Sequence, residues 1–165
     1  MPETTQIVIN TGPIIAITAA LGNLSILDRL YKRVYIPAEV KQEIIAGGRH
    51  GFGVPEFNDA VWLKIIPTSQ IIPHFLRNSL DLGEASVIQL ALSKNISTVC
   101  IDETVGRRVA RLNGLKLTGS IGILIRAKQA GLISSLGQSL QRMRKNGIWV
   151  SEKIVNLALK KIGEK

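Results

Sequence analysis

The chain has 165 residues, of which 45% are hydrophobic and 20% charged, proportions that are typical of one globular domain and exclude extended disorder. A single cysteine, Cys100, excludes a disulfide framework, and two histidines are too few for a Cys/His structural zinc site. The first residues lack the basic and apolar build of a signal peptide, and no apolar run reaches the ~18 residues that a membrane span needs. We therefore expect a soluble, cytoplasmic protein without membrane association. We also expect a single domain over residues 1–165, with C-terminal helices from about residue 138.

The net charge of +9 is distributed unevenly along the chain. Residues 1–82 carry seven basic and seven acidic side chains, whereas residues 83–165 carry fourteen basic and five acidic ones. This asymmetry favours an anionic partner such as nucleic acid. A basic surface that only keeps the protein in solution would have the same composition, so the charge leaves both interpretations open.

Short apolar runs alternate with segments of helical periodicity. The runs predict strands at residues 6–9, 34–36, 97–101 and 115–117. The periodic segments predict helices at residues 14–21, 24–31, 37–46, 83–94, 103–112 and 121–130. A glycine-rich loop is expected at residues 47–55, and two further helices are expected to meet near Gly147. This alternation predicts an α/β protein whose central parallel sheet is covered by helices on both faces.

Polar residues follow the ends of the predicted strands. Asn10 follows the first strand, Asp102 and Glu103 follow the strand at 97–101, and Ser120 lies just past the last strand. Ligands of open parallel sheets bind outside the carboxyl ends of the strands, so these side chains are the first candidates for a functional site. The alternative role for Asp102 is that of N-cap of the following helix.

Two glutamates lie on or near the predicted buried stripes of their helices. At 100° per residue, Ile88 and Ala91 lie about 40° and −20° from Glu84, so Glu84 projects from the buried stripe. Asp81 and Glu84 also have the spacing of a capping box, which is the alternative explanation for Glu84. Glu43 lies at the edge of a similar stripe, and an ordinary half-exposed glutamate is the alternative there.

Carboxylates gathered at strand ends predict a divalent metal site. Packed carboxylates repel one another, and a bound cation removes that repulsion. Oxygen ligands without His or Cys select a hard ion such as Mg²⁺ or Mn²⁺, and the chemistry of such sites is phosphoryl transfer. The basic second half of the chain would attract a polyanionic substrate.

Five motifs follow one another along the chain: IVINTGPII at 7–15, IPAEVKQE at 36–43, LGEA at 82–85, IDETVGRRVA at 101–110 and TGSIGIL at 118–124. In this order they resemble the PIN-domain family of small nucleases, and specifically a branch of predicted nucleic-acid-binding PIN proteins. The resemblance implies a three-layer α/β/α sandwich, a cluster of acidic residues and Mg²⁺- or Mn²⁺-dependent cleavage of RNA. Many relatives, similar to the VapC type, are toxins that pair with an antitoxin protein and form homodimers.

The resemblance also implies roles for single residues. The catalytic and metal-binding set would be Asn10, Glu43, Glu84 and Asp102. Thr11 and Ser120 would be supporting hydroxyls that hold water or metal.

Three arginines, Arg107, Arg108 and Arg111, lie on the helix after Asp102, where they form either a solvated face or contacts to phosphate. Cys100, Trp62 and Trp149 are expected to be packing residues.

Asn10 departs from the catalytic pattern of the family, in which active relatives usually have an aspartate. Two functions therefore stay open. One is a metal-dependent endoribonuclease, such as a toxin of a toxin–antitoxin pair, and the other is a catalytically weak or inactive PIN module that binds nucleic acid or a protein partner. A receiver-type phosphoacceptor, a more distant third, would need an acidic pair near Asn10 that the sequence lacks.

Overall fold

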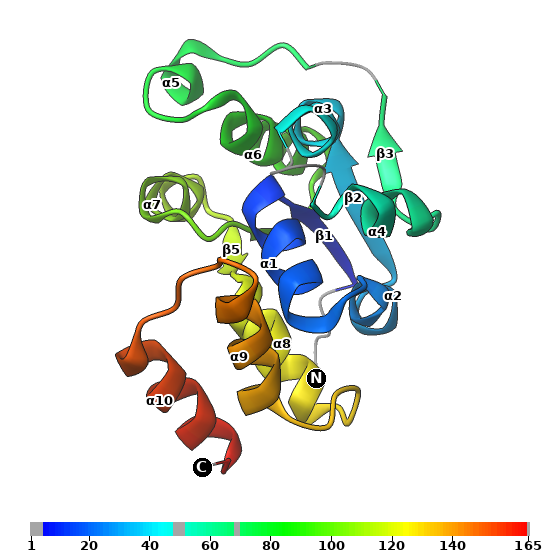
Figure 1. Cartoon of the computed structure of the whole chain (residues 1–165). Coiled ribbons are helices and arrows are strands. Elements are labelled where there is room, and N and C mark those ends of the chain that lie inside the picture. Colours follow the sequence, from blue (N-terminus) through cyan, green and yellow to red (C-terminus); the bar gives the residue numbers. More distant parts are fainter. Residues whose placement is uncertain (1–4, 48–51, 68–69, 165) are drawn as a thin grey trace.

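A parallel sheet of five strands forms the centre of the part of the chain that the structure describes (Figure 1). This computed structural model describes residues 5–47, 52–67 and 70–164. The strand order is β3-β2-β1-β4-β5, and every neighbouring pair is parallel. The strands are β1 (Gln6–Ile9), β2 (Arg33–Pro37), β3 (Lys64–Ile66), β4 (Thr98–Cys100) and β5 (Lys116–Thr118).

The central strand β1 is buried on both faces. Ile7, Val8 and Ile9 have no exposed surface, as expected for a strand that helices cover on both sides. Val8 pairs with Val99 of β4, and Ile9 pairs with Cys100. The residues that follow β1 and β4 therefore leave the sheet side by side at its carboxyl edge.

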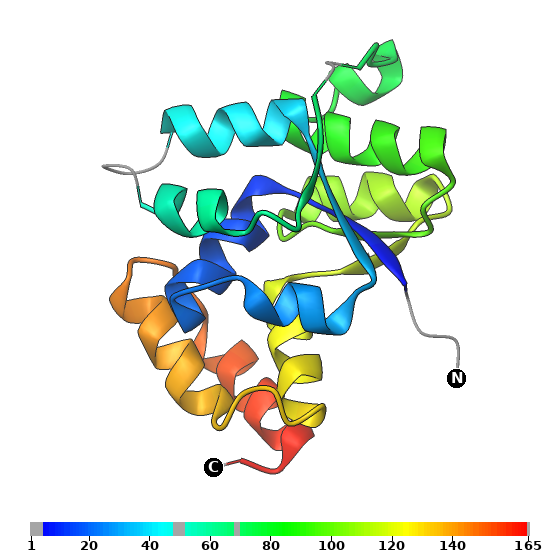
Figure 2. The same cartoon turned by 90° about the vertical axis from the view of Figure 1, so that its right-hand side faces the viewer.

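Helices cover both faces of the sheet and make three layers (Figure 2). Helices α3, α6 and α7 lie on one face, while α1, α2 and α8 lie on the other, where α9 packs against α1 and α10 against α8. The described helices are α1 (Thr11–Leu21), α2 (Ser25–Leu30), α3 (Ala38–Gly47), α4 (Val54–Asp59), α5 (His74–Arg77), α6 (Leu82–Lys94), α7 (Thr104–Leu112), α8 (Ser120–Gln129), α9 (Leu136–Lys145) and α10 (Glu152–Ile162).

The predicted fold class is confirmed: the structure is an α/β/α sandwich with a parallel sheet. The largest boundary shift is at α1, which begins at Thr11 rather than at residue 14. Asn10 has the extended conformation of an N-cap, with φ −81° and ψ 168°. Pro13 then falls in the first turn, where backbone N–H groups have no partner within the helix and proline is tolerated.

Three short elements, β3, α4 and α5, were not predicted. Each has too few residues to show the periodicity of a strand or a helix. Part of the loop expected at 47–55, residues 48–51, lies outside the described residues, and α4 already begins at Val54. The two C-terminal helices lie on either side of Gly147, with α9 starting two residues earlier than expected. Within residues 5–47, 52–67 and 70–164, no helix is both long and apolar enough to cross a bilayer.

Candidate functional site

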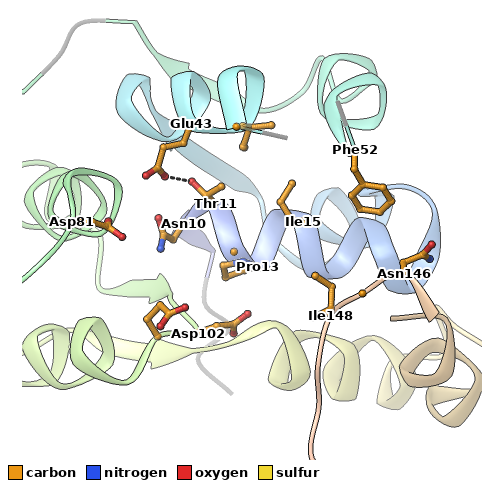
Figure 3. A pocket seen from close by; sticks show the side chains of 15 residues that line it. Asn10, Thr11, Pro13, Ile15, Glu43, Phe52, Asp81, Asp102, Asn146 and Ile148 are labelled. Atoms are coloured by element: carbon orange, nitrogen blue, oxygen red, sulfur yellow. Dashed lines mark hydrogen bonds between the residues drawn. The ribbon is translucent and has the colours of Figure 1, made fainter. Parts of the chain in front are cut away.

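A cavity of about 590 Å³ opens at the carboxyl edge of the sheet, beside the ends of β1 and β4 (Figure 3). The sheet extends from β1 toward β2 on one side and toward β4 on the other, so the cavity lies at the switch point where parallel α/β folds bind ligands. The polar end of the cavity is lined by Asn10, Thr11, Glu43, Asp81, Asp102 and Glu103.

Asn10 is held rigidly at this edge while its side-chain oxygen stays unpaired. The backbone N–H of Asn10 donates to the carbonyl of Cys100 at 3.1 Å, and the residue is only 6% exposed. An asparagine at an N-cap usually accepts a hydrogen bond from the first turn, but the Asn10 side chain makes no such bond. Its Oδ1 is buried and has no hydrogen-bond partner among the described residues. A buried oxygen without a hydrogen-bond partner is rare in proteins unless a water, a ligand or an ion binds to it.

Glu43 reaches the same cavity from α3. Its Oε1 accepts a hydrogen bond from the hydroxyl of Thr11, the first residue of α1. Burial raises the pKa of Glu43 above its ordinary 4.5, the Thr11 hydrogen bond opposes this, and the negative charge of Asp81 adds to it. Glu43 is half-buried, as the alternative of a half-exposed glutamate also allows, but its carboxylate is held by the Thr11 hydroxyl at the cavity. The role of Thr11 in holding water or metal stays a prediction.

Glu84 takes part in the capping box with Asp81 and also lies on the buried stripe of its helix. Asp81 caps α6 by accepting the backbone N–H of Glu84 at 2.8 Å, so the capping box is real. The Glu84 side chain is nevertheless buried, with 6% exposure, as its place on the buried stripe predicts. Burial raises its pKa, and the negative charges of Asp81, Glu103 and Glu43 raise it further, while a hydrogen bond from the Asp81 backbone lowers it. Glu84 therefore belongs electrostatically to the acidic group, although it does not line the cavity itself.

Asp102 lies across the cavity from Glu43, with Asn10 between them (Figure 3). Its Oδ1 accepts the backbone N–H of Ser120 at 2.8 Å, which ties the end of β4 to the start of α8. The N-cap of α7 is Glu103, so the alternative role of Asp102 as that cap is wrong. Ser120 is buried and supports Asp102 through its backbone N–H.

The three arginines of α7 have different environments. Arg107 is half-buried, and its Nη1 donates to the carbonyl of Ile101 at 2.8 Å, so this guanidinium fixes the end of β4. Arg108 and Arg111 are exposed. Because they are exposed, Arg108 and Arg111 are better candidates for phosphate contacts than Arg107.

Two features of the cavity were not predicted as parts of a site. Asp81 was assigned only as a helix cap, yet its carboxylate lines the cavity and raises the pKa values of both glutamates. Asp81 directly precedes the motif LGEA at 82–85, and this position could have indicated that it belongs to the site. The other end of the cavity is apolar and comes from segments far apart in the sequence, so no local pattern could have indicated it; it includes Pro13, Ile15, Ile44, Phe52, Asn146 and Ile148.

The donor chemistry of the polar end fits a hard divalent cation. Its side chains offer carboxylate, amide and hydroxyl oxygens, which Mg²⁺ and Mn²⁺ prefer. The Oδ1 of Asn10 is buried without a hydrogen-bond partner among the described residues, and burial, together with the charge of Asp81, raises the pKa values of Glu43 and Glu84. A bound cation would favour the ionised form of both carboxyl groups. In the described part of the chain, no three His, Cys, Asp or Glu side chains are already grouped closely enough to hold one ion.

A family model described as a PIN domain matches residues 6–164. The match spans all five strands and all ten helices that the structure describes. No curated protein matches the chain.

Proposed function

The chain belongs to the PIN-domain family, and we propose that it is a metal-dependent endoribonuclease. A PIN domain has a nuclease-type fold and generally uses divalent metal ions. The observation that carries the proposal is the buried, unpaired Oδ1 of Asn10, which lies between Glu43 and Asp102 at the switch point of the sheet. An amide oxygen without a partner, flanked by carboxylates, is a ligand position rather than a packing position.

The residues proposed to hold Mg²⁺ or Mn²⁺ are Asn10, Glu43, Glu84 and Asp102. The ion would supply Lewis-acid stabilisation of the phosphodiester and a more acidic water. The chain's own contribution is orientation: Thr11 aims the Glu43 carboxylate, and the Ser120 N–H aims that of Asp102.

The alternative function is a catalytically weak or inactive PIN module that binds nucleic acid or a protein partner. The neutral side chain of Asn10 favours it, because an aspartate there would give the ion one more negative ligand. A toxin role with an antitoxin partner, homodimer formation and a cytoplasmic location stay predictions. Light scattering of the purified chain would test the dimer, and co-purification with the product of an adjacent gene would test the antitoxin.

The deciding experiment is cleavage of an unstructured RNA in Mn²⁺, Mg²⁺ or EDTA. We expect cleavage with either metal and none in EDTA, and we expect Asp102→Asn to lower the rate by at least about tenfold. Asp28→Asn is the matched control, because Asp28 is an exposed aspartate on α2 and does not line the cavity. Metal-independent RNA binding without cleavage would instead support the inactive module.

A further inference from the structure

The cavity continues from its acidic end along α1 to an apolar end. There Ile15 projects from α1, Phe52 precedes α4, and Ile148 lies in the connection between α9 and α10 (Figure 3). The acidic side chains lie at one end of this space and the three apolar side chains at the other. A molecule that fills the cavity must therefore combine a group for the acidic end with an apolar face.

Phe52 is held in this wall by the glycine that follows it. Gly53 has φ +84°, which other residues rarely adopt, and an added Cβ there would lie 3.0 Å from Cδ1 of Ile15. The turn before α4 thus packs directly on α1 and places the Phe52 ring beside Ile15. Phe52 is only half-buried, so part of its surface remains available to a ligand.

The opposite wall contains a fixed polar group. The Asn146 Nδ2 donates to the carbonyls of Ala19 and Arg142, each at 3.0 Å, which fixes the amide at the cavity wall. An apolar pocket with one fixed amide suits a flat group that has polar edges.

A second hollow extends the same wall. It shares Gly147 and Ile148 with the cavity and adds Trp149. Trp149 is 82% exposed, so the expectation that it is a packing residue is wrong. Arg144 lines the same hollow. Exposed aromatic side chains beside a basic residue are typical of surfaces on which the bases of single strands stack.

We propose that the apolar end of the cavity, between Phe52 and Ile148, holds an unpaired nucleobase of the strand whose phosphodiester lies at the acidic end. This inference rests on the proposed nuclease function and adds to it a subsite for one base of the substrate strand. A base in a duplex is stacked and paired on its polar edge, so it cannot enter a pocket of this kind without being extruded.

Binding without turnover tests the proposal. In Ca²⁺ and, separately, in EDTA, fluorescence anisotropy compares a short labelled oligoadenylate with a sugar–phosphate oligomer of equal length that has no bases. Ca²⁺ takes the same oxygen ligands as Mg²⁺ and offsets the negative charge at the acidic end, so the arm in Ca²⁺ decides. We expect the wild-type chain to bind the oligoadenylate about tenfold more tightly. Phe52→Leu keeps apolar bulk but lacks an aromatic face, so it should lose most of this preference, whereas Phe52→Tyr should keep it. Phe75→Leu is the matched control, since Phe75 is 54% exposed on α5 and does not line the cavity.

Equal binding of the two probes by the wild-type chain, or an undiminished preference in Phe52→Leu, would overturn the proposal. The outcome is independent of the cleavage assay. A metal-dependent nuclease without base preference rejects only this inference. A base preference without cleavage supports the base site and rejects the nuclease function. Thermal unfolding of each variant confirms that it folds.

Discussion

Gly83 leaves room for the carboxylate of Glu43, because a Cβ on residue 83 would lie 2.9 Å from Cδ of Glu43 and still closer to Oε1. The same relationship occurs twice more. A Cβ on Gly106 would lie 3.0 Å from Oε2 of Glu84, and one on Gly119 would lie 2.7 Å from Oδ1 of Asp102. The three carboxylates that we propose as metal ligands therefore each lie against a glycine, and their positions depend on the absence of those side chains.

The first prediction concerns Gly83→Ala. Alanine stabilises a helix by about 1 kcal/mol relative to glycine, so α6 itself should not be weakened. The added methyl group should push the Glu43 carboxylate out of place and reduce metal binding. We expect thermal unfolding in EDTA to change little, while the rise in Tm on adding Mn²⁺ falls by at least half. Gly137→Ala is the control, because Gly137 is the second residue of α9, as Gly83 is of α6, and does not line the cavity. An undiminished Mn²⁺ response in Gly83→Ala would remove Glu43 from the site.

The second prediction concerns Asn10→Asp. This change adds a fourth carboxylate at a buried position beside Glu43, so it should destabilise the metal-free protein. It should also tighten divalent binding, so that the same Mn²⁺ concentration stabilises the variant more than the wild type, by about 1.4 kcal/mol for each tenfold decrease in Kd once the site is saturated. The measurement is calorimetric titration with Mn²⁺ combined with thermal unfolding, and cleavage activity should equal or exceed that of the wild type. If metal affinity does not change, Asn10 is not a ligand.

The third prediction concerns the pH dependence of stability. The folded pKa of Glu84 is raised, chiefly by burial, so its contribution to stability is fully present below the unfolded value near 4.5 and is lost as the pH rises through the folded value. Glu84→Gln removes this loss. The free energy of unfolding of the variant should therefore increase relative to the wild type as the pH rises above 4.5, as urea unfolding at a series of pH values would show.

Glu164 provides the control with the opposite sign. Its pKa is held below 4.5 by the backbone N–H of Gly137, together with bonds from Leu136 and Ser135 at the N-terminus of α9. Its contribution is present above the unfolded pKa and is lost as the pH falls through the folded value. Glu164→Gln should therefore lose stability relative to the wild type as the pH rises. Curves of the same sign for both variants would contradict the assigned environment of Glu84.

The fourth prediction separates the arginines of α7. The double change of Arg108 and Arg111 to glutamine should leave thermal unfolding unchanged, since both side chains are exposed. If each contacts one phosphate of a single strand, the slope of log K against log[salt] should become shallower by about 1.4. Arg107→Gln, in contrast, should lower stability because it removes the hydrogen bond to the Ile101 carbonyl. A double variant that binds RNA with the wild-type salt dependence would show that Arg108 and Arg111 serve solubility only.

Local patterns in the sequence determined the architecture and the centre of the site. The apolar run Gln6–Ile9 and its counterparts predicted parallel strands, because a strand that is covered on both faces must be apolar throughout. The positions of Asn10 and Asp102 directly after two strands placed both at one edge of the sheet. Helical periodicity predicted the burial of Glu84, since residues four and seven positions apart share one face.

Only the tertiary structure decided which distant segments meet. Phe52 and Ile148 have no local feature that marks a cavity wall. Glu39 is buried, and its carboxylate accepts the backbone N–H of Gln70, far along the chain, at 3.0 Å. Ser120 supports Asp102 through a backbone N–H, which every residue except proline possesses, so its identity carried no signal. The unpaired oxygen of Asn10 likewise depends on what surrounds it. The periodicity of a segment indicates which of its side chains face the protein core. Which segments contact one another depends instead on the spatial order of the strands in the sheet, and periodicity does not contain that order.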